Sequence, residues 1–142
     1  MKPREPFAPS RRTGWFVGRS DIGDYMHRWI CETPFGAVRL HHILRSDEAR
    51  ALHDHPWTFC SLLISGGYWE VTDAGRTWWP RFSVRRVRAE TPHRLILDSP
   101  VWTLVVTGPK AREWGFHTDS GWMHWREARA LWAGWANEEQ EP

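Results

Sequence analysis

Residues His53–Gly67 read HDHPWTFCSLLISGG, and this stretch decides how the fold is interpreted. Alternate residues of a β-strand point to the same side, so an extended backbone here would aim the imidazoles of His53 and His55 at one point. The run from residue 57 to 64 is strand-like, and the two glycines that follow it predict a turn. The alternative is a pair of surface histidines on an edge strand.

A third histidine follows a proline later in the chain. His93 comes directly after Pro92 and precedes the apolar run Leu95–Leu97. Imidazole is the commonest neutral metal ligand near neutral pH. Two histidines on one strand and one from a later strand can form a three-nitrogen site with open positions for water or substrate. We therefore predict that His53, His55 and His93 bind one divalent transition metal.

On these residues the chain resembles the cupin superfamily, and its layout is similar to small cupin-like proteins of bacteria and phages. The first cupin motif carries His-x-His before a glycine turn, and the second adds a histidine after a proline turn. The resemblance covers residues 40–109 and implies an all-β fold, a small antiparallel jelly-roll barrel. The chain departs from the pattern where the carboxylate ligand after His55 is missing and where Glu90 replaces a glycine. The matching residues are His53, His55, Gly66, Gly67, Pro92 and His93.

Without that carboxylate, the pattern is similar to the thiol dioxygenases, which are cupins with three histidine ligands. The spacing from His53 to Cys60 also matches the mammalian-type cysteine dioxygenases, and this implies a catalytic Cys60 beside the metal. In that family the cysteine is cross-linked to a tyrosine on a later strand, but the comparable run Trp102–Thr107 contains none. Strand alternation places Cys60 opposite His55, so it reaches the site only through a bulge, for which Pro56 is the natural place. The alternative is that Cys60 is a small buried residue.

Two further side chains are predicted to bind substrate. Arg39 lies on the strand before the motif, and a guanidinium can hold a carboxylate through two hydrogen bonds; the alternative is that it faces solvent. Trp57 shares the face of His53 and His55 if alternation is unbroken. The adjacent His41 and His42 must point to opposite faces, so one of them can enter the pocket.

The function that these residues favour is an Fe(II)-dependent dioxygenase acting on a small anionic or thiol-containing metabolite. Fe(II) is the preferred metal and Zn or Ni are alternatives, because imidazole suits all three. One alternative function is a non-catalytic cupin that holds a metal or small ligand. Another is an interaction module, or a homodimer, that uses a tryptophan-rich surface, since the chain has 12 Trp, several of them in residues 114–125. The alternative is that most of these tryptophans fill the core of the fold.

The 142 residues predict one domain, with a flexible segment at 1–13, a barrel at 14–136 and an acidic tail at 137–142. Residues 46–51 predict a turn or a single helical turn with Ser46 or Asp47 as its cap, and residues 126–133 predict a helix that ends at Gly134. The predicted strands are 24–31, 35–44, 57–64, 68–72, 77–79, 82–88, 95–98, 102–107, 112–117 and 122–125.

Charge and composition argue against several classes of partner. The net charge of +2 is too small to indicate nucleic-acid binding, and the arginines at 81, 85, 86 and 88 read as a solvated strand face. No apolar run has the length of a membrane span, and the N-terminus lacks the apolar core of a signal peptide. The two cysteines, Cys31 and Cys60, require no disulfide. These features predict a cytoplasmic protein whose partner is a small-molecule ligand.

Overall fold

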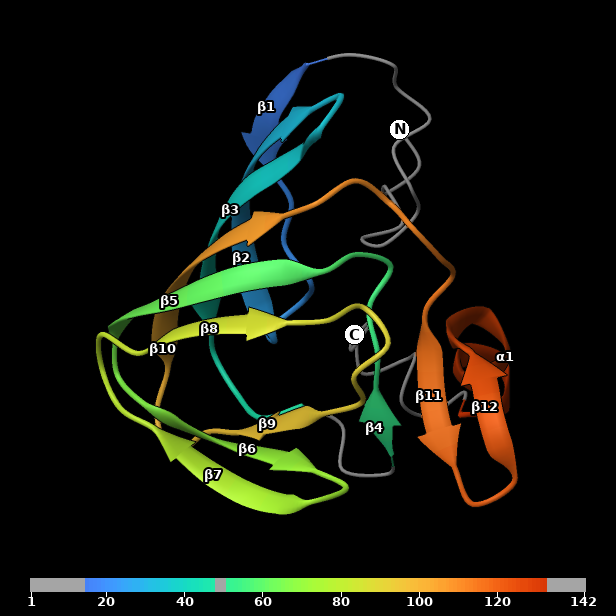
Figure 1. Ribbon diagram of the computed structural model, residues 1–142. Coiled ribbons are helices and arrows are strands. Elements are labelled where there is room, and N and C mark those ends of the chain that lie inside the picture. The colour runs from blue at the N-terminus through green and yellow to red at the C-terminus, as the bar shows by residue number, and fades with distance from the viewer. Residues whose placement is uncertain (1–14, 48–50, 133–142) are drawn as a thin grey trace.

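The computed structural model describes residues 15–47 and 51–132, and it consists of antiparallel strands with one short helix (Figure 1). The predicted tails at 1–13 and 137–142, and Gly134, lie outside the described residues. The elements in chain order are β1 (Phe16–Arg19), β2 (Met26–Thr33), β3 (Gly36–Ile43), β4 (Leu52–His53), β5 (Phe59–Ser65), β6 (Tyr68–Thr72), β7 (Gly75–Trp79), β8 (Val84–Val87), β9 (Arg94–Ile96), β10 (Val101–Thr107), β11 (Gly115–Thr118), β12 (Gly121–His124) and α1 (Trp125–Leu131).

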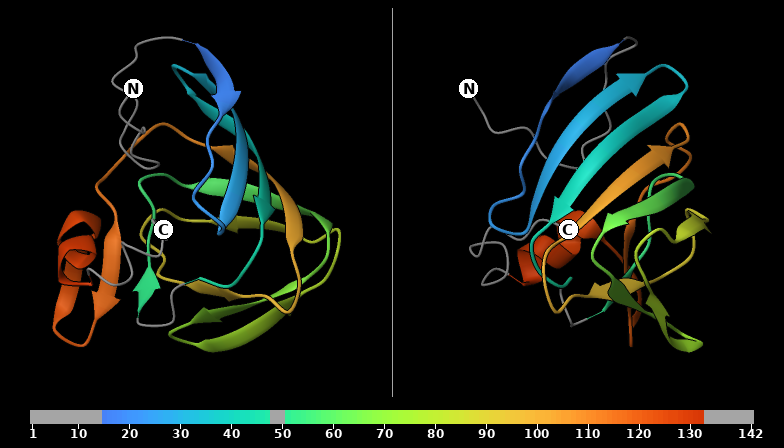
Figure 2. Two further views of the ribbon diagram at one scale, coloured as in Figure 1. Left: turned by 180° about the vertical axis from the view of Figure 1, so that it is seen from behind. Right: turned by 90° about the vertical axis from the view of Figure 1, so that its left-hand side faces the viewer.

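The strands form three hydrogen-bonded sheets. The largest has six strands in the order β1-β2-β3-β10-β5-β8, and two smaller sheets have the orders β12-β11-β4 and β7-β6-β9. Figures 1 and 2 show β6, β7 and β9 lying across from β5 and β8, with the β11–β12 hairpin and α1 at one end of the molecule. Each pairing between strands is antiparallel.

The predicted all-β fold with a C-terminal helix is confirmed, but the closed barrel is not. The described strands make separate sheets, because the backbone leaves the ladder between β4 and β5 and again before β9. Pro56 and Pro92 lie in these two breaks, and proline has no N–H with which to continue a ladder. The resulting jelly roll is open where the chain passes from one sheet to the next.

Strand alternation decides which side chains reach the interior. On β3 the side chains of Ala37, Arg39 and Ile43 are buried, whereas Val38 is exposed. The predicted inward orientation of Arg39 is therefore what the structure shows. A register shift in the pairing of β5 with β10 makes Ile64 the extra residue, so the bulge lies at the end of β5 and not at Pro56.

Two apolar clusters hold the layers together. The first lies between the sheets and is made of Ile22, Tyr25, Met26, Ile43, Leu63, Tyr68 and Val101. The second lies under α1, where Trp114 and Trp125 stack with ring centroids 5.9 Å apart. Much of the C-terminal aromatic block is therefore core, although Trp122 at the hairpin is 45% exposed. This packing agrees with the expectation that tryptophans fill the core.

Helix α1 begins after His124, whose Nδ1 accepts a hydrogen bond from the backbone N–H of Arg126 at 3.2 Å. Such a side-chain acceptor satisfies one of the free N–H groups at a helix start. At seven residues, α1 is short, and no helix in the described ranges has the length and apolar character to cross a bilayer.

Candidate metal centre

His53, His55 and His93 meet at one point inside the fold, as the spacing predicted. One ring nitrogen from each lies within 4.8 Å of the others, and the ring centroids are 4.9–5.0 Å apart. His53 and His93 form a backbone bridge in which each N–H donates to the other's carbonyl at 2.9 Å. The N–H of His55 donates to the carbonyl of Ala89 at 2.9 Å. Backbone pairing between distant segments thus brings the three imidazoles together.

Glu70 lies behind the third histidine. Its Oε2 lies 2.7 Å from Nδ1 of His93, and the Arg85 guanidinium lies 2.5 Å from the same oxygen. Burial raises the pKa of Glu70, but the bonds from His93 and Arg85 outweigh it and leave the pKa below its usual value. An ionised carboxylate only accepts, so Nδ1 of His93 donates and Nε2 is left for a metal. A carboxylate behind a ligating imidazole is the usual support of metal-bound histidine.

The other two imidazoles are held neutral. Burial lowers the pKa of His53 to about 4, although Asp47 and Asp54 act in the opposite direction. Burial, followed by the charges of His93 and His53, lowers the pKa of His55 well below its usual value. Nδ1 of His55 is also buried and has no hydrogen-bond partner. Neutral imidazole is the form that binds metal, so the donor set fits a transition-metal ion.

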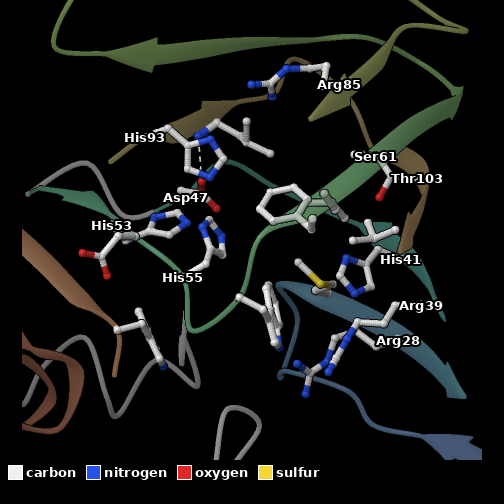
Figure 3. Close-up of a pocket in the computed structure, with 18 of the residues that line it drawn as sticks. Arg28, Arg39, His41, Asp47, His53, His55, Ser61, Arg85, His93 and Thr103 are labelled. Carbon is white, nitrogen blue, oxygen red and sulfur yellow. Dashed lines mark hydrogen bonds between the residues drawn. The ribbon is translucent and has the colours of Figure 1, made fainter. Parts of the chain in front are cut away.

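A cavity of about 100 Å³ adjoins the three histidines (Figure 3). Both predicted substrate-binding residues line it, and the guanidinium carbon of Arg39 lies 5.1 Å from the centre of a Trp57 ring. An apolar cavity of ~150 Å³ accommodates benzene, so this space suits a molecule of a few heavy atoms. Asp47 is also in the wall, where it accepts hydrogen bonds from the Tyr25 hydroxyl and from the Leu95 N–H.

The predicted position of Cys60 beside the metal site is wrong. Cys60 is exposed on the outer face of β5, while its neighbours Phe59 and Ser61 are buried and line the cavity. Alternation is regular along β5 from Phe59 onward, whereas residues 54–58 lie outside any strand. The thiol therefore lies on the opposite side of the sheet from the three histidines.

Of the remaining histidines, His41 lines the cavity and the others lie outside it. His41 lines the cavity, whereas His42 lies on the outer face and stacks on Trp102 with ring centroids 4.1 Å apart. His117 and His124 contact carboxylates, at 2.9 Å from Asp54 and 3.0 Å from Glu113 respectively. His27 lies 3.3 Å from Arg19. None of these three lines the cavity.

Asp54, the residue between the paired histidines, is fully buried and holds the β11–β12 hairpin against the segment 53–55. Its Oδ1 accepts from the Gly115 N–H at 2.8 Å. Its Oδ2 lies 2.9 Å from donors on His117, Trp122 and Arg112. The carboxylate thus joins the segment 53–55 to the β11–β12 hairpin, a role that sequence reasoning did not assign.

Sequence reasoning also missed Glu70 and the inward role of Arg85. Glu70 lies two residues after Tyr68 on β6, so both side chains are on the same, buried face of the strand. A carboxylate at a position that alternation places in the interior is the signal that could have identified it. Arg85 was grouped with a solvated arginine face, but its side chain is only 10% exposed and pairs with Glu70. Arg81, Arg86 and Arg88 are exposed as expected.

The fold can be compared with solved structures. No family model and no curated protein sequence matches the chain. A cupin-2 domain protein from Rhodospirillum rubrum has a TM-score of 0.58 at 11% identity, covering 82% of this chain and 86% of that one. This chain has the cupin fold. An RmlC-like cupin from Shewanella frigidimarina gives 0.55 at 16% identity, with 80% and 97% covered.

Two other structural neighbours are enzymes or metal-containing proteins by description. A sugar phosphate isomerase of the cupin superfamily from Silicibacter pomeroyi has a TM-score of 0.54 at 14% identity, covering 70% of this chain and 75% of that one. The Fe(II) form of HppE has a TM-score of 0.52 at 11% identity, covering 72% and 61%. At these identities the likeness shows the cupin fold and leaves activity open.

Proposed function

We propose that this cupin binds one divalent transition metal through His53, His55 and His93 and acts on a small molecule in the adjoining cavity. The observation that carries the proposal is the three-histidine cluster with Glu70 hydrogen-bonded behind His93. A buried carboxylate–histidine pair next to two neutral imidazoles is an arrangement that suits a transition metal and supports this proposal.

The proposed metal is Fe(II), with Zn and Ni as alternatives, because three imidazoles suit each of these ions. When bound, such an ion supplies a Lewis acid, and Fe(II) in addition supplies a centre that reacts with dioxygen. The chain's own residues then hold and shield the substrate. Arg39 offers a charged donor from β3, and Trp57 covers one wall of the cavity.

The first candidate reaction is the oxidation of a small anionic molecule by dioxygen. The Fe(II) neighbour among the cupins is in keeping with this choice. The outward Cys60 removes the specific argument for a thiol substrate, so the substrate class rests on the basic side chains of the cavity. A sugar phosphate is anionic, so the neighbour described as a sugar phosphate isomerase agrees with an anionic ligand here.

A second candidate is a cupin that binds a ligand without converting it. Among the described residues, the carboxylates that line the cavity are already bonded: Asp47 to Tyr25 and Leu95, and Asp54 to the hairpin. A carboxylate with both oxygens occupied is a poor general base. A cytoplasmic location and a homodimer remain predictions.

Oxygen consumption tests the first candidate. Protein loaded anaerobically with Fe(II) is mixed with a panel of small carboxylic and phosphorylated acids, and oxygen uptake is recorded. Uptake that depends on one acid and disappears in the His93→Ala variant supports an oxidase or oxygenase. Tight binding of an acid with no oxygen uptake and no product would instead favour the ligand-binding candidate.

A further inference from the structure

Buried polar side chains cross the inner face of the large sheet, where apolar residues are expected. Arg28 on β2 is directly opposite His41 on β3, and His41 is directly opposite Thr103 on β10. Arg28 and Thr103 are each only 2% exposed. Buried polar groups need a reason, because their desolvation is costly unless they find partners.

Arg39 lies two residues further along β3, on the same face, and its charge is only weakly compensated. Its Nη2 lies 3.9 Å from Oε1 of Glu32, which is too far for a hydrogen bond, and its buried Nε has no hydrogen-bond partner. The side chain is 10% exposed and lies over a Trp57 ring. A buried guanidinium with an unpaired N–H beside a cavity is suited to receive an anion.

His41 offers a second unpaired group in the same wall. Its Nε2 is buried and has no hydrogen-bond partner. Burial, together with the charges of Arg28 and Arg39, lowers its pKa well below the usual value, so it is neutral and has one N–H to donate. Arg28 is held by the carbonyl and hydroxyl of Ser20, and it adds positive charge next to His41.

The two sets of side chains lie on different sides of one cavity. In Figure 3, His53, His55 and His93 gather on one side, and His41, Arg39 and Arg28 gather on the other. Apolar side chains, among them Met26, Phe59 and Val105, line the same space. A ligand that fits this cavity therefore meets metal ligands at one end and basic donors at the other.

We propose that Arg39 and His41, with Arg28 beside them, form an oxyanion subsite opposite the three histidines. The ligand class is a small molecule with a carboxylate or phosphate group on this subsite and a metal-binding oxygen group at its other end. The metal-binding end of the ligand rests on the proposed function, whereas the oxyanion subsite itself does not need a metal. Guanidinium and imidazole N–H groups are the usual donors to such oxyanions.

The subsite is tested first in metal-free protein. Acetate and inorganic phosphate are titrated separately into the chelator-treated protein, and the Nε–H resonance of Arg39 is followed by NMR. Either anion that binds should shift this resonance, and Arg39→Gln or His41→Leu should weaken the binding by about tenfold or more, the value of one charge-assisted hydrogen bond. Arg86→Gln, on the exposed outer face of β8, is the matched control and should bind as the wild type does.

The two probes also distinguish the chemistry of the anion, since binding of acetate alone identifies a carboxylate subsite and binding of phosphate alone a phosphate subsite. Circular dichroism confirms that each variant is folded. The proposal is overturned if neither anion binds the wild type, or if Arg39→Gln and His41→Leu, both folded, bind as tightly as Arg86→Gln.

The second test asks whether one ligand contacts the oxyanion subsite and a bound metal at the same time. Malonate, succinate and glutarate are titrated into Zn-loaded and metal-free protein, with phosphonoacetate as the phosphate-like counterpart of malonate. One length should bind about tenfold tighter with metal than without, and both Arg39→Gln and the His53→Ala, His55→Ala variant should abolish that gain. Equal affinity of all lengths with and without metal overturns the two-ended ligand. If Zn does not bind but acetate or phosphate still does, the subsite stands and the proposed function fails.

Discussion

Oε2 of Glu70 lies 2.7 Å from Nδ1 of His93, so a carboxylate on β6 orients an imidazole that comes from the start of β9, 23 residues later in the chain. The same oxygen accepts from Arg85 of β8. Three strands therefore fix the direction in which Nε2 of His93 points. This relationship holds the His93 ring in one orientation within the histidine cluster.

Replacing Glu70 by glutamine should weaken metal binding by about 10–100-fold, the usual effect of removing the partner of a ligating histidine. The amide keeps the shape but holds the Nδ1 proton of His93 less strongly. Metal affinity is measured by competition with a chelator of known affinity. Glu127→Gln, on the exposed face of α1, is the control and should leave affinity unchanged. Equal affinities in the two variants would contradict the positioning role of Glu70.

Asp54→Asn should lower the free energy of unfolding by about 3 kcal/mol, because three donors converge on an oxygen of a fully buried carboxylate. An amide cannot compensate the Arg112 charge. The loss should appear in urea denaturation, where Asp73→Asn in the exposed β6–β7 loop serves as control. A change of less than about 0.5 kcal/mol, the range of ordinary surface substitutions, would show that the hairpin does not depend on Asp54.

Cys60 should behave as a surface thiol. In native protein it should react with a thiol reagent without prior unfolding, since its side chain is exposed. Cys60→Ser should leave metal affinity and any oxygen consumption unchanged, because the thiol is on the outer face of β5. Mass spectrometry of the labelled protein identifies the modified residue. Slow labelling of Cys60 together with lost activity in the serine variant would restore a role at the site.

The strands could be predicted from local alternation, and the histidine cluster from the spacing of His53 and His55 and from the position of His93 after Pro92. The expected strand 68–72 coincides with β6, and most others differ by a few residues at their ends. Two strands, β1 and β4, were missed, and β4 has only two residues, which show no periodicity.

What the sequence could not provide was long-range pairing. Glu70 meets His93 only because β6 pairs with β9, and Asp54 meets its donors only because β11 pairs with β4. Local patterns also misplaced the bulge. Pro56 was the natural candidate, but the segment around it leaves the sheet altogether, and the register shift lies at Ile64, where β5 pairs with β10. The outward direction of Cys60 follows from that difference.

Acid should destabilise the metal-free protein in part through His41. The pKa of this residue in the folded protein lies well below 6.5, as burial and then Arg28 and Arg39 lower it. Above pH 6.5 it is neutral in both states and has no effect. Below that pH the unfolded chain takes up a proton that the folded protein does not, so stability falls as the pH falls.

The His41→Gln variant should therefore lose less stability between pH 6.5 and 5 than the wild type. The difference in slope should approach about 1.4 kcal/mol per pH unit at most. Urea denaturation at several pH values, in the presence of a chelator, provides the measurement. Parallel pH profiles of the two proteins would mean that His41 titrates normally in the folded state.

Metal content measured on the wild type and on the His53→Ala, His55→Ala variant tests the central claim most directly. Each protein is dialysed to equilibrium against Fe(II) without oxygen, and in parallel against Zn and Ni, and the bound ion is quantified. We predict one ion per chain in the wild type and none in the variant. Its circular dichroism spectrum should be unchanged, because the apolar clusters do not need the ion. A wild type that retains no ion, or a folded variant that retains a full equivalent, would contradict the account.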